Sequence, residues 1–200
     1  MIIMITNVCN MTCEHCCFAC TEEGEYMTKE IFLKALQLGL NRNVSIMGGE
    51  PTLHPKLWEF LCIAMASGAD VRVGTNGLLE KEAITLASMA RHGLIRCQLS
   101  IDKYHRVISP KVVRAFKEGL HHQIQGDKRT IMTNYTMAAS GRATKFGLPV
   151  CCCDDIFVLP DGDVYGCGCF KHRFGNVLTG YEIPDWYDWE CTNGRSWYTK

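Results

Sequence analysis

Five cysteines stand within twelve positions near the start of the chain, in the stretch CNMTCEHCCFAC. Two overlapping sets share the spacing C-x3-C-x2-C, one made of Cys9, Cys13 and Cys16, the other of Cys13, Cys17 and Cys20. Three thiolates at this spacing can ligate three irons of a cubane iron–sulfur cluster, because soft iron sites prefer sulfur. The fourth iron would then have no protein ligand and could bind another molecule.

Two other interpretations of these cysteines are open. Residues i, i+4 and i+7 share one helix face, so the thiols could be buried in a core, and a zinc site could use two C-x2-C pairs. The stretch also carries polar residues: Asn10, Thr12, Glu14 and His15. They make it too polar for a core helix. The two C-x2-C pairs adjoin at Cys16 and Cys17, which leaves no chain to fold back around zinc, so the cluster is favoured.

Composition and charge indicate an ordinary globular protein, with 47% apolar and 21% charged residues. The 21 basic and 21 acidic residues give a net charge of zero, and no block of like charge indicates nucleic acid or a membrane surface as a partner. The opening MIIMITNVCN has no basic flank or cleavage site, so neither a signal peptide nor a membrane span is expected. We expect a cytoplasmic protein whose 13 cysteines ligate metal or do redox work.

Apolar, β-branched runs alternate with helical patterns over most of the chain. The expected strands are Ile2–Thr6, Val44–Met47, Val71–Gly74, Arg96–Ile101 and Thr130–Asn134. The expected helices begin after Thr28, at His54-Pro55, at Lys81 and at Ser109-Pro110. This alternation predicts βα units around a parallel sheet, in which chemistry collects at the carboxyl ends of the strands.

Unusual polar or glycine-rich segments follow four of the expected strands. The cysteines follow the first, Gly48-Gly49-Glu50-Pro51 follows the second, Thr75-Asn76-Gly77 follows the third, and Ser100-Ile101-Asp102 ends the fourth. Because these strand ends meet at one rim, the four segments are expected to form one site. Glycines let the backbone approach a ligand, and Glu50 could accept hydrogen bonds from an ammonium group. Ordinary turns and a loop cap are the alternatives for these segments.

A second group of cysteines follows a break in the βα rhythm. The stretch CCCDDIFVLPDGDVYGCGC contains a predicted hairpin, Ile156–Leu159 and Asp163–Tyr165, around Pro160-Asp161-Gly162. We place a boundary near Leu148, which divides the chain into domains 1–147 and 148–200. The cysteines of the second part are Cys151, Cys152, Cys153, Cys167, Cys169 and Cys191.

These motifs resemble the radical S-adenosylmethionine (radical SAM) superfamily. The resemblance covers about residues 1–145 and consists of a strand, CNxxCxHC, a strand ending in GGEP, then TNG and SID. In that family the first cysteine closely follows strand one, and an aromatic residue or histidine usually precedes the third. Cys9, Cys13 and Cys16 meet both conditions, with His15 before the third cysteine, and Cys17 and Cys20 are then bystanders.

The resemblance implies an α/β fold, a partial (β/α)5–6 barrel with a small cysteine-bearing hairpin extension. It also implies a catalytic [4Fe–4S] cluster whose open iron binds SAM. An electron from a donor such as flavodoxin or ferredoxin splits SAM, and the resulting 5′-deoxyadenosyl radical takes hydrogen from a substrate. Gly48, Gly49, Glu50 and Pro51 would hold the SAM amino group. The other implied cofactor contacts are His15, Thr75, Asn76, Ser100, Asp102 and Asn134.

The C-terminal cysteines resemble the auxiliary-cluster region of the SPASM and twitch branches of this superfamily. Cys152, Gly162 and Cys167 fit C-x9–15-G-x4-C, and Cys151 fits equally well. Two flanking segments also fit: Gly141-Arg142-Ala143 and Phe174-Gly175-Asn176. The remaining chain is too short for a full SPASM domain, so one auxiliary [4Fe–4S] cluster is expected; zinc or an incompletely ligated cluster is the alternative. Its expected ligands are Cys151 or Cys152, Cys167, Cys169 and Cys191.

The motifs leave the substrate open. Related branches modify ribosomal peptides, oxidise a residue of sulfatases or transform small molecules. Because the chain opens on strand one, we expect no separate peptide-binding domain before it. A peptide or protein substrate is favoured slightly over a small molecule. A metal-binding or redox-sensing module without SAM chemistry is the alternative from another class. The GGEP segment argues against that alternative, because a sensor does not need a loop that binds an ammonium group.

Overall fold

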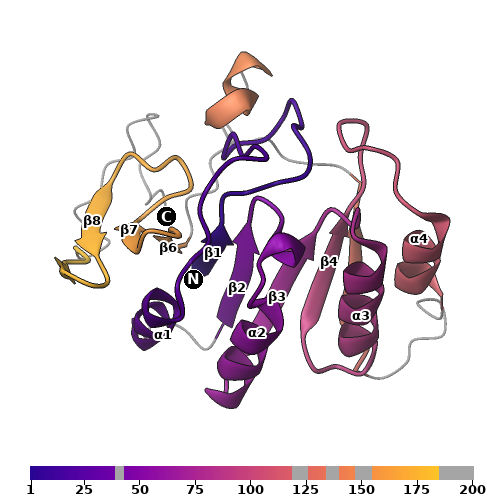
Figure 1. Cartoon of the computed structure of the whole chain (residues 1–200), viewed down its shortest axis with the longest axis horizontal. Helices are drawn as coiled ribbons and strands as arrows, with labels where there is room; N and C mark the ends of the chain where they lie inside the picture. Colours follow the sequence, from indigo (N-terminus) through magenta and orange to yellow (C-terminus); the bar gives the residue numbers. More distant parts are fainter. Residues whose placement is uncertain (39–42, 119–125, 134–139, 147–154, 185–200) are drawn as a thin grey trace, which may run out of the picture.

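A single sheet runs through the computed structural model, which describes residues 1–38, 43–118, 126–133, 140–146 and 155–184. Its strand order is β5-β4-β3-β2-β1-β6-β7-β8-β9 (Figure 1). The first five strands are β1 Ile2–Thr6, β2 Asn43–Gly48, β3 Asp70–Thr75, β4 Arg96–Ser100 and β5 Arg129–Met132. Neighbours among them are parallel and follow chain order, as the alternating sequence predicts.

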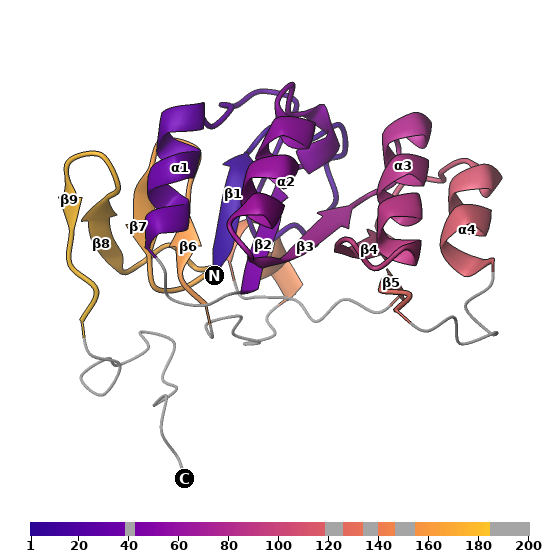
Figure 2. The same ribbon diagram turned by 90° about the horizontal axis from the view of Figure 1, so that it is seen from below.

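Four helices cover one face of this sheet (Figure 2). They are α1 Lys29–Gln37, α2 Leu57–Ala66, α3 Glu80–Arg91 and α4 Pro110–Lys117. Right-handed crossovers between strands in sequential order place every helix on the same face, which is the winding of a (β/α) barrel. The predicted α/β fold is therefore confirmed.

The predicted helix starts are confirmed with two shifts, of which the smaller places the start of α3 at Glu80, one residue before the expected Lys81. The Thr28 hydroxyl caps α1 by accepting from the backbone N–H of Ile31, and the Ser109 hydroxyl caps α4 by accepting from the N–H of Lys111. The helix expected at His54-Pro55 begins only at Leu57, after a short 3-10 turn, Pro51–Leu53. His54 therefore lies before the helix, and its Nδ1 accepts a hydrogen bond from the N–H of Lys56.

The C-terminal strands extend the same sheet beyond β1. They are β6 Phe157–Val158, β7 Asp163–Tyr165, β8 Arg173–Asn176 and β9 Gly180–Tyr181. β6 lies parallel to β1 with Ile2 opposite Phe157, whereas β7, β8 and β9 pair antiparallel. The predicted hairpin is thus confirmed as β6–β7, and Gly162 in its turn has φ +90. The boundary expected near Leu148 lies outside the described residues.

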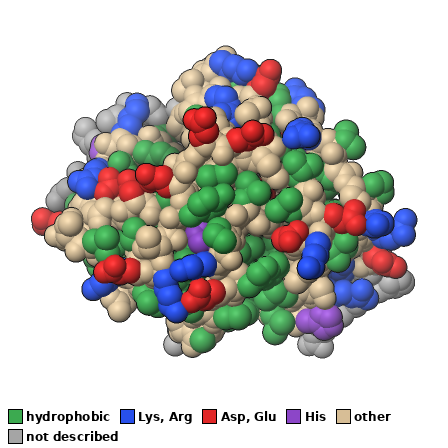
Figure 3. All heavy atoms as spheres, in the orientation of Figure 1, with side chains coloured by type: hydrophobic (Ala, Val, Ile, Leu, Met, Phe, Trp, Pro, Cys, Tyr) green, Lys and Arg blue, Asp and Glu red, His purple; other side chains and the backbone are tan. Residues whose placement is uncertain are grey.

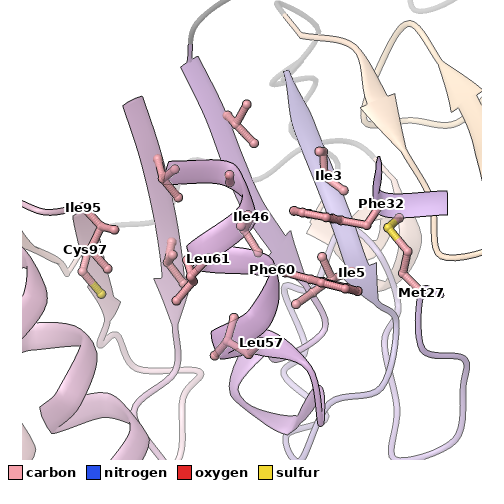
Figure 4. Packing of buried hydrophobic residues seen from close by; sticks show 14 of the residues in the cluster. Ile3, Ile5, Met27, Phe32, Ile46, Leu57, Phe60, Leu61, Ile95 and Cys97 are labelled. Atoms are coloured by element: carbon pink, nitrogen blue, oxygen red, sulfur yellow. The ribbon is translucent and has the colours of Figure 1, made fainter. Parts of the chain in front are cut away.

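The main core lies between the sheet and the helices. Side chains that alternate along the strands, such as Ile3 and Ile5, meet apolar residues of α1 and α2 (Figure 4). Phe32 and Phe60 stack there with ring centroids 4.1 Å apart and planes 3° from parallel. This packing holds the strands, and hence their carboxyl ends, as one rigid platform.

The helix-covered face of the molecule carries interspersed acidic, basic and apolar side chains (Figure 3). Leu33 and Trp58 are among the large apolar residues exposed on the surface. Among the described residues there is no helix with the length and apolar character that a membrane crossing requires.

Candidate functional site

The chain that leads into the cysteine loop is held by the loop after β2. The N–H of Gly49 donates to the carbonyl of Thr6 at 2.8 Å. A Cβ on Gly48 would lie 2.2 Å from that same Thr6 oxygen, and one on Gly49 would lie 2.2 Å from the carbonyl oxygen of Val8. Both glycines are therefore required by the close approach of two backbones. The sequence predicted that these glycines let the backbone approach a ligand. It gave no sign of their contact with the residues just before Cys9.

Glu50 joins the loops after β2 and β3. Its carboxylate is 1% exposed, and it accepts hydrogen bonds from the N–H and hydroxyl of Thr52, the hydroxyl of Thr75 and the N–H of Asn76, at 2.7 to 3.2 Å. Burial raises the pKa of Glu50, while these hydrogen bonds act in the opposite direction. The carboxylate expected to face an ammonium group is thus engaged inside the protein, and the adjacent Pro51 is buried as well.

Asn76 connects the end of β3 to the cysteine loop. Its Nδ2 donates to Oδ1 of Asn10 at 2.9 Å and lies 3.9 Å from the sulfur of Cys9. Its Oδ1 accepts from the N–H of Leu78 at 2.9 Å, which fixes the orientation of the amide. The predicted convergence of the cysteine, GGEP and TNG segments at one rim is therefore present in the geometry.

The three cysteines of the favoured register lie close to one another. Cys9 is buried and Cys13 and Cys16 are half-buried, around a small apolar cluster that includes Met11 and Cys20. Burial raises the pKa of the Cys9 thiol to about 11, and the charges of Cys16 and Cys13 also act to raise it. Buried thiols of this kind are poor nucleophiles, but a soft metal can still take them as thiolates.

The chemistry of the three side chains suits iron, because thiolates are the soft ligands that iron–sulfur clusters prefer. Among the described residues, the His, Cys, Asp and Glu side chains whose ligand atoms lie within 4.8 Å of one another in a group of three are His15, Asp102 and His105. The cysteines therefore do not form a compact site for a single ion in the described part of the chain.

Cys20 contacts the third cysteine of this set. A hydrogen bond from Cys20 is the main cause that lowers the pKa of Cys16 to about 5, and the same bond, followed by burial, raises the pKa of Cys20. Cys17 is buried nearby. The two extra cysteines are therefore buried within the same loop.

Asp102, after β4, positions His15. Its carboxylate lies 3.4 Å from Nε2 of His15 and 2.8 Å from Nδ1 of His105, and it accepts from the N–H of Tyr104. The Tyr104 ring lies 4.7 Å from that of His15 at 30°. Burial alone would raise the pKa of Asp102, but the hydrogen bonds from His105 and Tyr104 outweigh it and lower the pKa. Ser100 lies nearby, at the carboxyl end of β4.

Sequence reasoning missed a contact made by the segment Ser140–Phe146. Arg142 donates from Nε to the carbonyl of Cys13, at a sequence separation of 129 residues. The motif Gly141-Arg142-Ala143 was visible in the sequence, but nothing local connected it to the N-terminal cysteines. Only the folded chain brings the two segments together.

The C-terminal cysteines are only partly described. Cys167 is buried and Cys169 half-buried, directly after β7. Phe170 stacks on Phe18 of the cysteine loop, with centroids 5.5 Å apart, so the two cysteine-bearing regions are in contact. The other residues expected at these sites lie outside the described residues: Asn134, Cys151, Cys152, Cys153 and Cys191.

Comparisons with known proteins find relatives that match part of this chain. The mycofactocin maturase MftC of Mycobacterium ulcerans is 30% identical over 102 residues, which cover 49% of this chain and 27% of that protein. A probable GTP 3′,8-cyclase of Saccharolobus islandicus is 31% identical over 158 residues, 72% of this chain and 49% of that protein. The chain thus spans less than half the length of these relatives.

Solved structures show the same fold. SuiB of Streptococcus suis bound to S-adenosylmethionine matches 92% of this chain and 65% of its own, with a TM-score of 0.50 and 12% identity. SuiB bound to its precursor peptide SuiA matches 90% and 62%, with a TM-score of 0.52. The family model of the radical SAM superfamily matches residues 3–163, which include the cysteine loop and the GGEP loop on the carboxyl rim of the sheet, and the chain belongs to that superfamily.

Proposed function

We propose that this chain is a radical SAM enzyme in which Cys9, Cys13 and Cys16 hold the catalytic [4Fe–4S] cluster. The observation that carries the proposal is the cysteine loop itself, tied at its start to the Gly48–Glu50 backbone and flanked by Asn76. When bound, the cluster and SAM supply a 5′-deoxyadenosyl radical that abstracts hydrogen from the substrate. An external low-potential donor, such as flavodoxin or ferredoxin, provides the electron.

The residues of the rim hold this site in place. The backbone of Gly48 and Gly49 lies against the strand that ends before Cys9, and their carbonyls are the acceptors for the SAM amino group. Glu50 acts mainly by joining the two loops, since its carboxylate is closed to solvent. Asp102 acts by holding His15 beside Cys16, because its oxygens already bind two imidazoles. Thr75, Ser100 and Asn134 remain proposed SAM contacts.

A peptide or protein is the proposed substrate. The relative MftC is named a maturase, and SuiB was solved with a precursor peptide, which supports a peptide for this chain as well. The GTP 3′,8-cyclase relatives support the alternative, a small molecule. Residues 148–200 are proposed to hold an auxiliary cluster, with Cys167 and Cys169 among its ligands.

Anaerobic reconstitution with iron and sulfide, followed by iron counting and an assay for 5′-deoxyadenosine, tests the proposal. About four irons indicate one cubane and about eight indicate two. With SAM and a reductant the wild type is expected to release 5′-deoxyadenosine. Bound zinc without any nucleoside product would contradict the proposal and favour a metal-binding or sensing module.

A matched pair of variants tests the register. Cys9→Ala is expected to abolish SAM cleavage, whereas Cys17→Ala, which removes another buried thiol of the same loop, is expected to retain it. The opposite pattern would assign the cluster to the second register.

A further inference from the structure

A short segment, Ser140–Phe146, lies over the cysteine loop at the carboxyl rim (Figure 1). Most of it is a 3-10 helix, Gly141–Phe146. Lys145 pairs with Glu14 at 3.0 Å, and the Phe146 ring packs edge-on against Tyr104, which in turn lies against His15. The segment therefore touches the loop at several points, although more than a hundred residues separate them in the sequence.

Arg142 makes the central contacts of this segment. Its Nε donates to the carbonyl of Cys13 at 2.8 Å, its Nη2 to the carbonyl of Cys20 at 2.9 Å, and its backbone N–H to the carbonyl of Cys16 at 2.9 Å. Ser140 adds a fourth bond, from its hydroxyl to the carbonyl of Cys17 at 2.9 Å. One segment thus binds the carbonyls of four of the five clustered cysteines.

This arrangement depends on both the shape and the charge of the guanidinium. Converging carbonyls place the negative ends of their dipoles together, and a planar cation with several fixed donors can bind more than one of them at once. Close approach is also required at Gly141, where φ is +54 and a Cβ would lie 2.4 Å from the carbonyl oxygen of Cys17. Within the described part of the chain, Arg142 forms no salt bridge, and the partners of its side chain there are backbone carbonyls.

We infer that Arg142 is a positioning residue for the iron–sulfur cluster, which fixes the cysteine loop and places a positive charge beside it that raises the cluster's reduction potential. Three thiolates around a [4Fe–4S] core leave a net negative charge, and reduction by one electron from the external donor adds another. A nearby cation stabilises the reduced state more than the oxidised state. This inference rests on the proposed function.

Redox titration of reconstituted protein, followed by electron paramagnetic resonance, tests the inference. The signal that changes when SAM is added belongs to the cluster with an open iron, which separates it from any auxiliary cluster. Arg142→Gln, which removes the charge and keeps an amide donor, is expected to shift the midpoint potential to more negative values and to speed iron loss to a chelator. Arg142→Lys keeps the charge but not the planar fork, so its potential is expected to stay near the wild-type value while iron loss is still faster.

Lys145→Met is the matched control, because Lys145 carries the same charge on the same short helix but is exposed and binds Glu14. It is expected to leave both measurements unchanged. A wild-type potential in Arg142→Gln, or equal shifts in the Gln and Lys variants, would overturn the inference. A wild-type protein without any SAM-responsive cluster would instead refute the proposed function, and the inference with it.

Discussion

Replacing Gly49 with alanine tests whether the GGEP glycines serve the approach of two backbones. The new Cβ would lie 2.2 Å from the carbonyl oxygen of Val8, 2.6 Å from its carbon and 2.9 Å from the carbonyl oxygen of Asn7. All three atoms are backbone, so no side-chain rotation relieves the clash. The loop after β2 and the chain before Cys9 must therefore separate.

The cost follows from two effects. Overpacking that forces a backbone shift destabilises a protein by about 1–3 kcal/mol. The shift also weakens the hydrogen bonds from the N–H of Gly49 to Thr6 and from the N–H of Glu50 to Val8, each of which contributes about 1 kcal/mol. We therefore expect Gly49→Ala to lower the free energy of unfolding by about 2–4 kcal/mol.

Urea denaturation under anaerobic, reducing conditions measures this loss, and Gly74→Ala is its control. A Cβ on Gly74 would meet only the end of the Met47 side chain, with Sδ at 2.9 Å and Cε at 3.5 Å. That thioether can rotate away, so the control is expected to lose less than about 1 kcal/mol. Equal stability losses in the two variants would refute the argument that backbone contact requires glycine at position 49.

Three further predictions concern buried groups. Glu50→Gln replaces a carboxylate oxygen, which accepts hydrogen bonds, with an amide NH₂ group, which donates them and would face the donors of Thr75 and Asn76. The free energy of unfolding in urea should therefore fall by about 1–3 kcal/mol, and an unchanged value would contradict the hydrogen-bond assignment. Asp127→Asn breaks the buried pair with Arg129 and should cost about 3 kcal/mol at neutral pH. The hydrogen bond from Arg129 lowers the pKa of Asp127 below 3.8. The pair therefore stabilises the protein above pH 3.8, and this stabilisation is lost as the pH falls through the lowered pKa. In the variant, the free energy of unfolding should depend less steeply on pH in the acid range. Phe60→Ala removes one of the two stacked core rings and should cost about 3–5 kcal/mol, and a loss below that of a surface substitution would show that the core repacks.

Much of the fold could be predicted because its signals are local. The apolar run Ile2–Thr6 is β1 at the predicted bounds, and Thr28 and Ser109 cap the helices that they were expected to cap. The hairpin around Gly162 follows from its turn residues. Each of these features depends on neighbours within a few positions, which a sequence displays directly.

The sequence by itself also determined the chemistry of the site, since thiols at C-x3-C-x2-C spacing before a GGEP strand already indicate the cluster and its family. Only the tertiary structure decided which side chains support that chemistry. Glu50 turns inward to join two loops, Asp102 holds His15, and Arg142 reaches the cysteine carbonyls from the far end of the βα region. Such contacts depend on how strand ends are stacked at a common rim, and no local pattern of residues encodes a partner that lies more than a hundred positions away.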